Sequence, residues 1–248
     1  MLVFHTRDSR WLSNSWLVAD REGGHAVLID TGGPIEPILE RIREWRVTPT
    51  HVLCTHHHPD HVMHNQDYRA EFGCPVCGHR DESELFGDLD HEMVDGEEIR
   101  SGDLHIRALH VPGHTLGQLA FLVDEAEVFT GDTLFEGSVG GTRGRGHTTY
   151  EDLQHSIMEV LMRLPKETVV RPGHMEVSTI EREWKDNPFV RYWRGVGETT
   201  ERRCRALGVD GVLLIEAEDY DGGTKCLVRF DDGHVDVVPG SRVEVDRD

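Results

Sequence analysis

The sequence THHHPDH occupies residues 55–61 and places four histidines and one aspartate within seven positions. In an extended segment every second side chain points the same way, so we expect His56, His58 and Asp60 to converge on one side. Pro59 disfavours helical geometry at His58 and so keeps this stretch extended. The spacing therefore indicates a group of side chains that act together.

These residue types suit a metal ion. Imidazole and carboxylate groups are ligands of Zn²⁺, Fe²⁺ and Mn²⁺. His61 lies at the start of the next helix, where the change of direction aims it beside Asp60. Four candidate ligands within six residues would leave one tetrahedral ion no open position, so the stretch predicts two adjacent metal ions.

Three later fragments share a second pattern, in which a β-type run ends at a glycine next to another potential ligand. Glycine permits the tight turn that presents such a side chain at the edge of a sheet. The fragments are VPGHT at 111–115, TGDT at 130–133 and RPGH at 171–174, and they contribute His114, Asp132 and His174.

Together, the segments THHHPDH, PGHTLGQLAF, FTGDTLF and VVRPGH resemble the metallo-β-lactamase fold superfamily in their order and spacing. The resemblance is greatest to the glyoxalase II-like (hydroxyacylglutathione hydrolase-like) branch, and it covers roughly residues 10–192, including STIEREWKDNPF. It implies an α/β fold, an αββα sandwich with the metal ions at the edge of the sheets. The motifs are much more specific for the fold and the metal centre than for the substrate.

The resemblance also implies a place for each ligand and a cofactor of two divalent ions, with zinc expected first and iron or manganese as alternatives. The ligands divide into a first site of His56, His58 and His114, a second site of Asp60, His61 and His174, and the bridging carboxylate of Asp132.

Two such ions can share a hydroxide. Coordination lowers the pKa of water from about 15.7 towards about 7, so the hydroxide forms at neutral pH. One ion would polarise a substrate carbonyl and the other would stabilise the leaving group, while Asp60 orients the hydroxide as a base. The expected function is a dinuclear metal-dependent hydrolase, most simply a glyoxalase II-like thioesterase. Its partner would be a small-molecule acyl thioester or a related ester.

Other functions stay open. Persulfide dioxygenases share the fold and motifs but use one iron on two histidines and one aspartate. A lactone, ester or β-lactam hydrolase of the same fold is a second alternative. Outside the enzymes, the chain could be a metal-bound scaffold that acts through its C-terminal segment.

The composition limits the partners. The 248 residues are 37% hydrophobic and 29% charged, enough to bury a core, and the net charge is −20. Such an acidic chain is not expected to bind nucleic acid or an anionic membrane. The sequence has no apolar run of ~20 residues, no N-terminal pattern of a secretory signal, and five cysteines without a disulfide framework. We therefore expect a soluble cytoplasmic protein with free thiols.

The sequence pattern of the chain changes after about residue 195. Residues 1–195 alternate β-type and helical runs, which suggests two sheets with helices packed outside them. Residues 205–248 hold four short β-type runs linked by turns such as Asp232-Gly233. We expect a small all-β, barrel-like domain resembling the SH3 or Tudor class. Because about 40 residues are marginal alone, it should pack on the main domain or on a second subunit of a homo-oligomer.

The glycine-rich loop at 136–147 corresponds to the substrate entrance of glyoxalase II-like proteins. Arg143, Arg145 and His147 are therefore expected to bind substrate, for example through a carboxylate, the alternative being a flexible turn. The helical region that binds glutathione in glyoxalase II is not recognisable in this sequence, which argues against glutathione as the thiol.

Two further features look like ligand motifs but favour simpler interpretations. His57 is expected to be a loop residue beside the ligands. Cys74 and Cys77 have the spacing of a zinc ribbon or redox pair, but no second pair exists, so buried ordinary thiols are favoured.

Overall fold

The computed structural model describes residues 1–245, and its first half is built around a six-stranded sheet. The strands of this sheet lie side by side in chain order: β1 (Leu2–Arg7), β2 (Asn14–Ala19), β3 (His25–Ile29), β4 (Thr48–Leu53), β5 (Val76–His79) and β6 (His91–Met93). The first three strands pair antiparallel, and β3 to β6 pair parallel.

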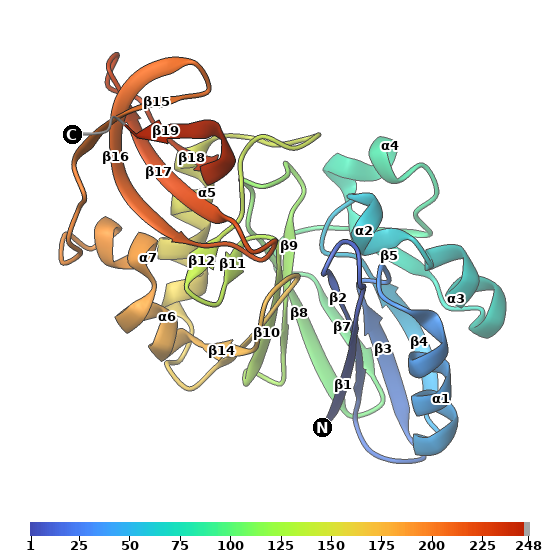
Figure 1. Ribbon diagram of the computed structural model, residues 1–248. Helices are drawn as coiled ribbons and strands as arrows, with labels where there is room; N and C mark the ends of the chain where they lie inside the picture. The colour runs from blue at the N-terminus through green and yellow to red at the C-terminus, as the bar shows by residue number, and fades with distance from the viewer. Residues whose placement is uncertain (246–248) are drawn as a thin grey trace.

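A second six-stranded sheet faces the first (Figure 1). In spatial order its strands are β14 (Ser178–Thr179), β13 (Val169–Pro172), β10 (Glu127–Gly131), β9 (Leu119–Val123), β8 (Leu104–His110) and β7 (Glu98–Ser101). The pair β10 and β13 is parallel, and the other neighbours are antiparallel. A short hairpin of β11 (Leu134–Phe135) and β12 (Ser138–Val139) follows β10.

Helices cover the outer face of each sheet (Figure 1). On the first sheet they are α1 (Ile35–Trp45), α2 (Pro59–Val62), α3 (Asn65–Phe72), the 3₁₀ turn η1 (Arg80–Glu82) and α4 (Ser83–Phe86). On the second they are α5 (Tyr150–His155) with its π and 3₁₀ continuations η2 (Ser156–Val160) and η3 (Leu161–Arg163), then α6 (Ile180–Asp186) and α7 (Pro188–Trp193). Within residues 1–245, no helix is both long and apolar enough to cross a membrane.

Strand β2 shows why the layers form. Its six residues are all buried, because both faces of the strand are covered. Trp16 and Val18 point into the apolar core between the two sheets, whereas Leu17 and Ala19 join the core beneath α1 and α3. The α/β fold class, with its αββα layers, is therefore confirmed.

The direction of the strands brings the candidate ligands together. Strands β8 and β10 both pair antiparallel with β9, so they point the same way, and β13 is parallel to β10. Their carboxyl ends consequently lie at one edge of the second sheet. The loops that hold His114, Asp132 and His174 start at these ends, opposite the loop that follows β4.

The C-terminal residues form the predicted all-β appendage as a five-stranded antiparallel sheet. In spatial order its strands are β18 (Val235–Pro239), β17 (Thr224–Phe230), β16 (Val209–Glu218), β15 (Arg202–Ala206) and β19 (Val243–Val245). The sequence predicted four of these strands and missed β15. The 3₁₀ turn η4 (Gly240–Arg242) carries the chain from one edge to the other. Strands β18 and β19 do not pair within the described residues, so the barrel-like sheet is open.

The appendage packs on the main domain. Leu214, Leu227 and Val237 share one apolar cluster with Leu153 of α5 and Phe189 of α7. A separate cluster fills the other face of the C-terminal sheet. The sheet thus buries one face against the outer helices of the second sheet.

All five cysteines are buried and free, as expected. Burial raises the pKa of Cys74 to about 11 and that of Cys77 to about 12, which keeps both thiols protonated at neutral pH. The interpretation of these two residues as ordinary core thiols is confirmed.

Candidate metal centre

The structure brings all seven predicted ligands together at the edge of the two sheets. They form three overlapping groups in which the ligand atoms lie within 4.8 Å of one another. The groups are His56 with His58 and His114, His56 with His61 and Asp132, and Asp60 with His61 and His174.

The extended run that the sequence predicted is shorter than expected. His58 is extended, with φ −63° and ψ 141°, as the following proline requires. Helix α2 begins at Pro59, so Asp60 leaves the two-residue alternation. Its carboxylate consequently groups with His61 and His174 and not with His56 and His58.

Hydrogen bonds on the outer sides of the rings determine which nitrogens face inward. His58 Nε2 lies 3.0 Å from the carbonyl oxygen of Arg145, and His114 Nδ1 lies 2.8 Å from that of Gly141. Both nitrogens must donate, so in neutral rings His58 Nδ1 and His114 Nε2 carry lone pairs. These two atoms are nevertheless only 3.0 Å apart. Facing lone pairs repel unless a cation lies between them, so the pair fits a metal ion.

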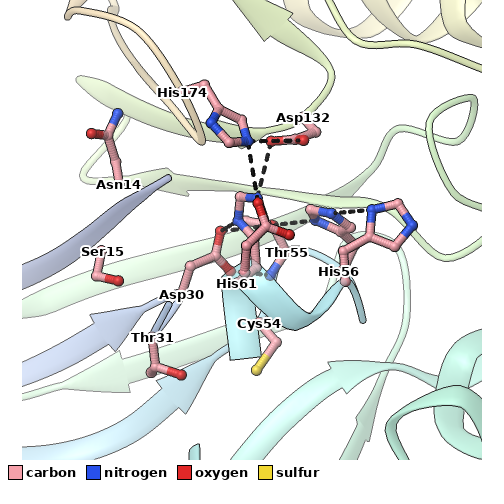
Figure 2. A network of polar contacts seen from close by, with 12 residues as sticks. Asn14, Ser15, Asp30, Thr31, Cys54, Thr55, His56, His61, Asp132 and His174 are labelled. Atoms are coloured by element: carbon pink, nitrogen blue, oxygen red, sulfur yellow. Dashed lines mark hydrogen bonds and ion pairs between the residues drawn. The ribbon is translucent and has the colours of Figure 1, made fainter. Parts of the chain in front are cut away.

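Asp30 orients two more rings in the same way. Thr55 Oγ1 donates to Asp30 Oδ2 at 2.8 Å and therefore accepts from His56 Nδ1 at 3.1 Å. Asp30 Oδ2 also accepts from His61 Nδ1 at 2.8 Å. Figure 2 shows His61 between Asp30 on one side and Asp132 on the other. In the neutral rings, the Nε2 atoms of His56 and His61 are thus left as lone-pair donors.

Asp132 lies between the two sets of histidines. Its Oδ1 is 3.3 Å from His61 Nε2, and its Oδ2 is 3.4 Å from His174 Nε2 and 3.5 Å from His114 Nε2. Asp60 Oδ2 is 3.5 Å from the Nε2 atoms of both His61 and His174. Ligand atoms bound at about 2.0–2.2 Å to one tetrahedral ion lie about 3.3–3.6 Å apart. The donor set and its spacing therefore fit metal binding.

The electrostatics point to a cation as well. Burial lowers the pKa values of His56, His58 and His114, in the case of His114 to about 4, so these three rings are neutral. Burial acts to lower the pKa of His61 too, but the carboxylates of Asp132, Asp30 and Asp60 raise it to about 10. Burial acts to raise the pKa of Asp132, yet neighbouring histidines hold it well below its usual range. The converging carboxylates carry negative charge that a divalent ion would neutralise.

Sequence reasoning missed two buried carboxylates that support the ligands. Glu82 Oε2 accepts from the backbone N–H of His57 at 3.0 Å and lies 2.7 Å from the ring Nδ1 of that residue. Glu82 Oε1 accepts from the backbone N–H of Gly117 at 2.8 Å, so Glu82 connects the loops of the first cluster. His57 is thus the loop residue that was predicted. The sequence around Asp30 could have indicated a site residue, since Asp30 follows β3 and lies just before Gly32 and Gly33. The sequence around Glu82 has no such pattern.

The three side chains predicted at the substrate entrance lie apart from one another. Arg143 lines a cavity beside His114 and pairs with Asp236 of the appendage. Arg145 lines a separate groove beside His58. His147 is exposed, and its Nδ1 lies 2.7 Å from the carbonyl oxygen of the next residue. A substrate role for these residues remains a prediction.

Comparisons with known proteins find similarity over most of the chain. The model of the metallo-beta-lactamase superfamily matches residues 8–174. Hydroxyacylglutathione hydrolase GloC of Haemophilus influenzae is 33% identical over 198 residues, which cover 71% of this chain and 92% of that protein.

Two solved structures extend the comparison. The crystal structure of ETHE1 from Myxococcus xanthus is similar with a TM-score of 0.69 and 31% identity, covering 77% of this chain and 84% of that one. TTHA1623, solved in a di-iron-bound form, has a TM-score of 0.63 and 31% identity, covering 75% of this chain and 99% of that one.

Proposed function

This chain belongs to the metallo-β-lactamase superfamily of metal-dependent hydrolases, and we propose that it hydrolyses acyl thioesters at a centre of two divalent ions. The observation that carries the dinuclear proposal is the position of Asp132. Its carboxylate lies within 3.5 Å of His114 on one side and of His61 and His174 on the other. A single carboxylate in that position can bind two ions at once.

The ligands are assigned to the ions as the resemblance implies. The first ion would be held by the group of His56, His58 and His114, and the second by the group of Asp60, His61 and His174. Asp132, which groups with one histidine of each set, His56 and His61, would bind both ions. When bound, such ions supply an activated water and polarise a carbonyl oxygen. Zinc is the first choice of metal, and the di-iron form of TTHA1623 supports iron as an alternative.

The residues of the chain orient the reacting groups and move the proton. Asp60 has a side chain that is 16% exposed and an oxygen 3.5 Å from both rings of the second cluster. It can therefore orient the attacking water and accept its proton. Asp30, Thr55 and the carbonyl of Gly141 hold the imidazoles in the tautomers that binding requires.

The thioester is favoured over other acyl compounds by the similarity to GloC, which spans most of both chains. The test combines metal analysis of the purified, metal-replete protein with a substrate panel. The panel holds thioesters, lactones and a β-lactam. Oxygen uptake is measured separately with a persulfide as the substrate. We expect about two ions per chain and thioester hydrolysis without oxygen uptake. One tightly bound iron with oxygen uptake on the persulfide would overturn the proposal.

A further inference from the structure

A cavity of about 180 Å³ lies directly against the candidate metal centre. His114 and Asp132 line one side of it. The C-terminal sheet lines the other side with Tyr220, Lys225 and Val237. The appendage therefore forms part of the wall of the site, although it lies outside the residues 8–174 that the family model matches.

Tyr220 brings the appendage into contact with a ligand. It lies in the loop between β16 and β17, and its ring stacks on that of His174 with centroids 3.9 Å apart and an interplanar angle of 16°. Phe135 meets the same tyrosine edge-on at 6.1 Å. The two aromatic rings therefore form this part of the cavity wall.

The cations beside the cavity are already paired. Lys225 has a side chain that is 8% exposed, and its Nζ lies 3.0 Å from Asp219 Oδ2. Arg143 pairs with Asp236. Because both positive charges are compensated by carboxylates of the appendage, a substrate carboxylate would find no unpaired cation in this wall.

The cavity is small. Its volume of about 180 Å³ is below the ~300–1,000 Å³ that is typical of small-molecule pockets. An acyl chain whose carbonyl lies at the metal centre would extend into this space and meet Tyr220 and Val237. A long chain would have to displace these side chains.

We propose that the C-terminal sheet forms the acyl subsite of this hydrolase, and that Tyr220 and Val237 restrict it to short, uncharged acyl groups. This inference rests on the proposed function. Tyr220 is a specificity-determining residue in this view, because its ring bounds the space that the acyl chain occupies.

The test measures kcat/KM for a series of straight-chain acyl thioesters, from acetyl to decanoyl, that all carry the same thiol. The succinyl thioester serves as the charged counterpart of the butyryl thioester. We expect the wild-type protein to prefer butyryl over octanoyl by at least tenfold and not to prefer succinyl over butyryl. Tyr220→Ala should raise the octanoyl-to-butyryl ratio about tenfold, and Val237→Ala should raise it in the same direction. Both variants should keep the wild-type metal content.

Phe230→Ala is the matched control, because Phe230 stacks on His234 at 4.2 Å in the same sheet but faces away from the cavity. It should lower stability and leave the chain-length profile unchanged. If Tyr220→Ala and Val237→Ala both keep the wild-type profile at full metal content, the proposal is wrong. A wild-type preference for succinyl would also overturn it.

A second measurement separates this inference from the proposed function. Butyrate should raise the Tm of the metal-loaded wild-type protein more than octanoate does, and Tyr220→Ala should reverse that order. This readout needs no turnover. If the wild-type protein cleaves no thioester, the proposed function fails, and the ligand-dependent Tm shift alone still decides whether the acyl subsite exists.

Discussion

Asp30 shows how one side chain outside the ligand set prepares the ligands. It accepts from the ring of His61 at 2.8 Å and from the hydroxyl of Thr55 at 2.8 Å. Removing its charge should weaken the tautomer that leaves His61 Nε2 free. We expect Asp30→Asn to lower metal affinity about 10–100-fold, measured by competition with a chelator.

The chain offers a matched control for this substitution. Asp67 accepts from His64 Nδ1 at the same distance, 2.8 Å, but the pair is exposed and both residues lie outside the ligand groups. Asp67→Asn should leave metal affinity unchanged. Equal effects of the two variants would show that Asp30 does not act through His61.

Asp132 is the ligand assigned to both ions, which gives it a distinct signature. Asp132→Ala should lower the occupancy of both sites, because it removes a ligand from each and a negative charge from between two cations. His174→Ala should mainly lower the occupancy of the second site. Activity of Asp132→Ala should fall by several orders of magnitude. Metal counting on variants with wild-type circular dichroism checks this, and two retained ions with near-normal turnover would contradict the bridging role.

The ligands were predictable because each lies in a short local pattern. His56, His58 and His61 lie within six residues of one another, and His114 and His174 each follow a glycine. Tyr220 was not predictable, because its contact with His174 depends on how a separate sheet packs. No local pattern at that position distinguishes it from any other loop tyrosine.

At the scale of elements, the glycines beside the ligands are required by close approach. A Cβ at Gly173 would lie 2.3 Å from Asp132 Oδ1 and 2.8 Å from His61 Cε1. Gly173→Ala should therefore displace the carboxylate and lower metal affinity at least tenfold. At Gly141, a Cβ would meet nothing closer than Lys225 Nζ at 4.0 Å, so Gly141→Ala should bind metal normally. Chelator competition on both variants tests the difference.

The boundaries of the elements were harder to predict than their order. The sequence predicts β-type runs at 104–110, 118–123 and 127–130. Strands β8, β9 and β10 agree closely with them, because buried apolar residues define these strands. Strand β15 reads Arg202–Ala206 with three arginines, so its apolar pattern is too weak to recognise. It exists because both its neighbours, β16 and β19, pair with it.

At the scale of the whole molecule, the apolar core is continuous between the main domain and the appendage. Leu214 and Leu227 of the C-terminal sheet lie in one cluster with Leu153 and Phe189. Removing residues 205–248 would expose that surface and the aromatic side of the acyl cavity. The proposed division at residues 1–195 and 205–248 is therefore a division of sequence pattern, and we expect the two parts to unfold together.

This expectation can be measured because all five tryptophans lie before residue 195. Tryptophan fluorescence thus reports on the main domain, including Trp193, which packs against the cluster that the appendage shares. Leu227 is fully buried in the shared cluster, so Leu227→Ala should destabilise the protein by about 2–5 kcal/mol through the cavity that it leaves. If unfolding is cooperative, the tryptophan transition should move to lower temperature by the same amount as the far-UV signal. Val209, in the same sheet but 53% exposed, provides the control, and Val209→Ala should shift neither signal.

A tryptophan transition that stays in place while the far-UV signal splits would show that the appendage unfolds independently. Its contribution to the acyl wall would then depend on a docking equilibrium, because a sheet that detaches also withdraws Tyr220 from His174.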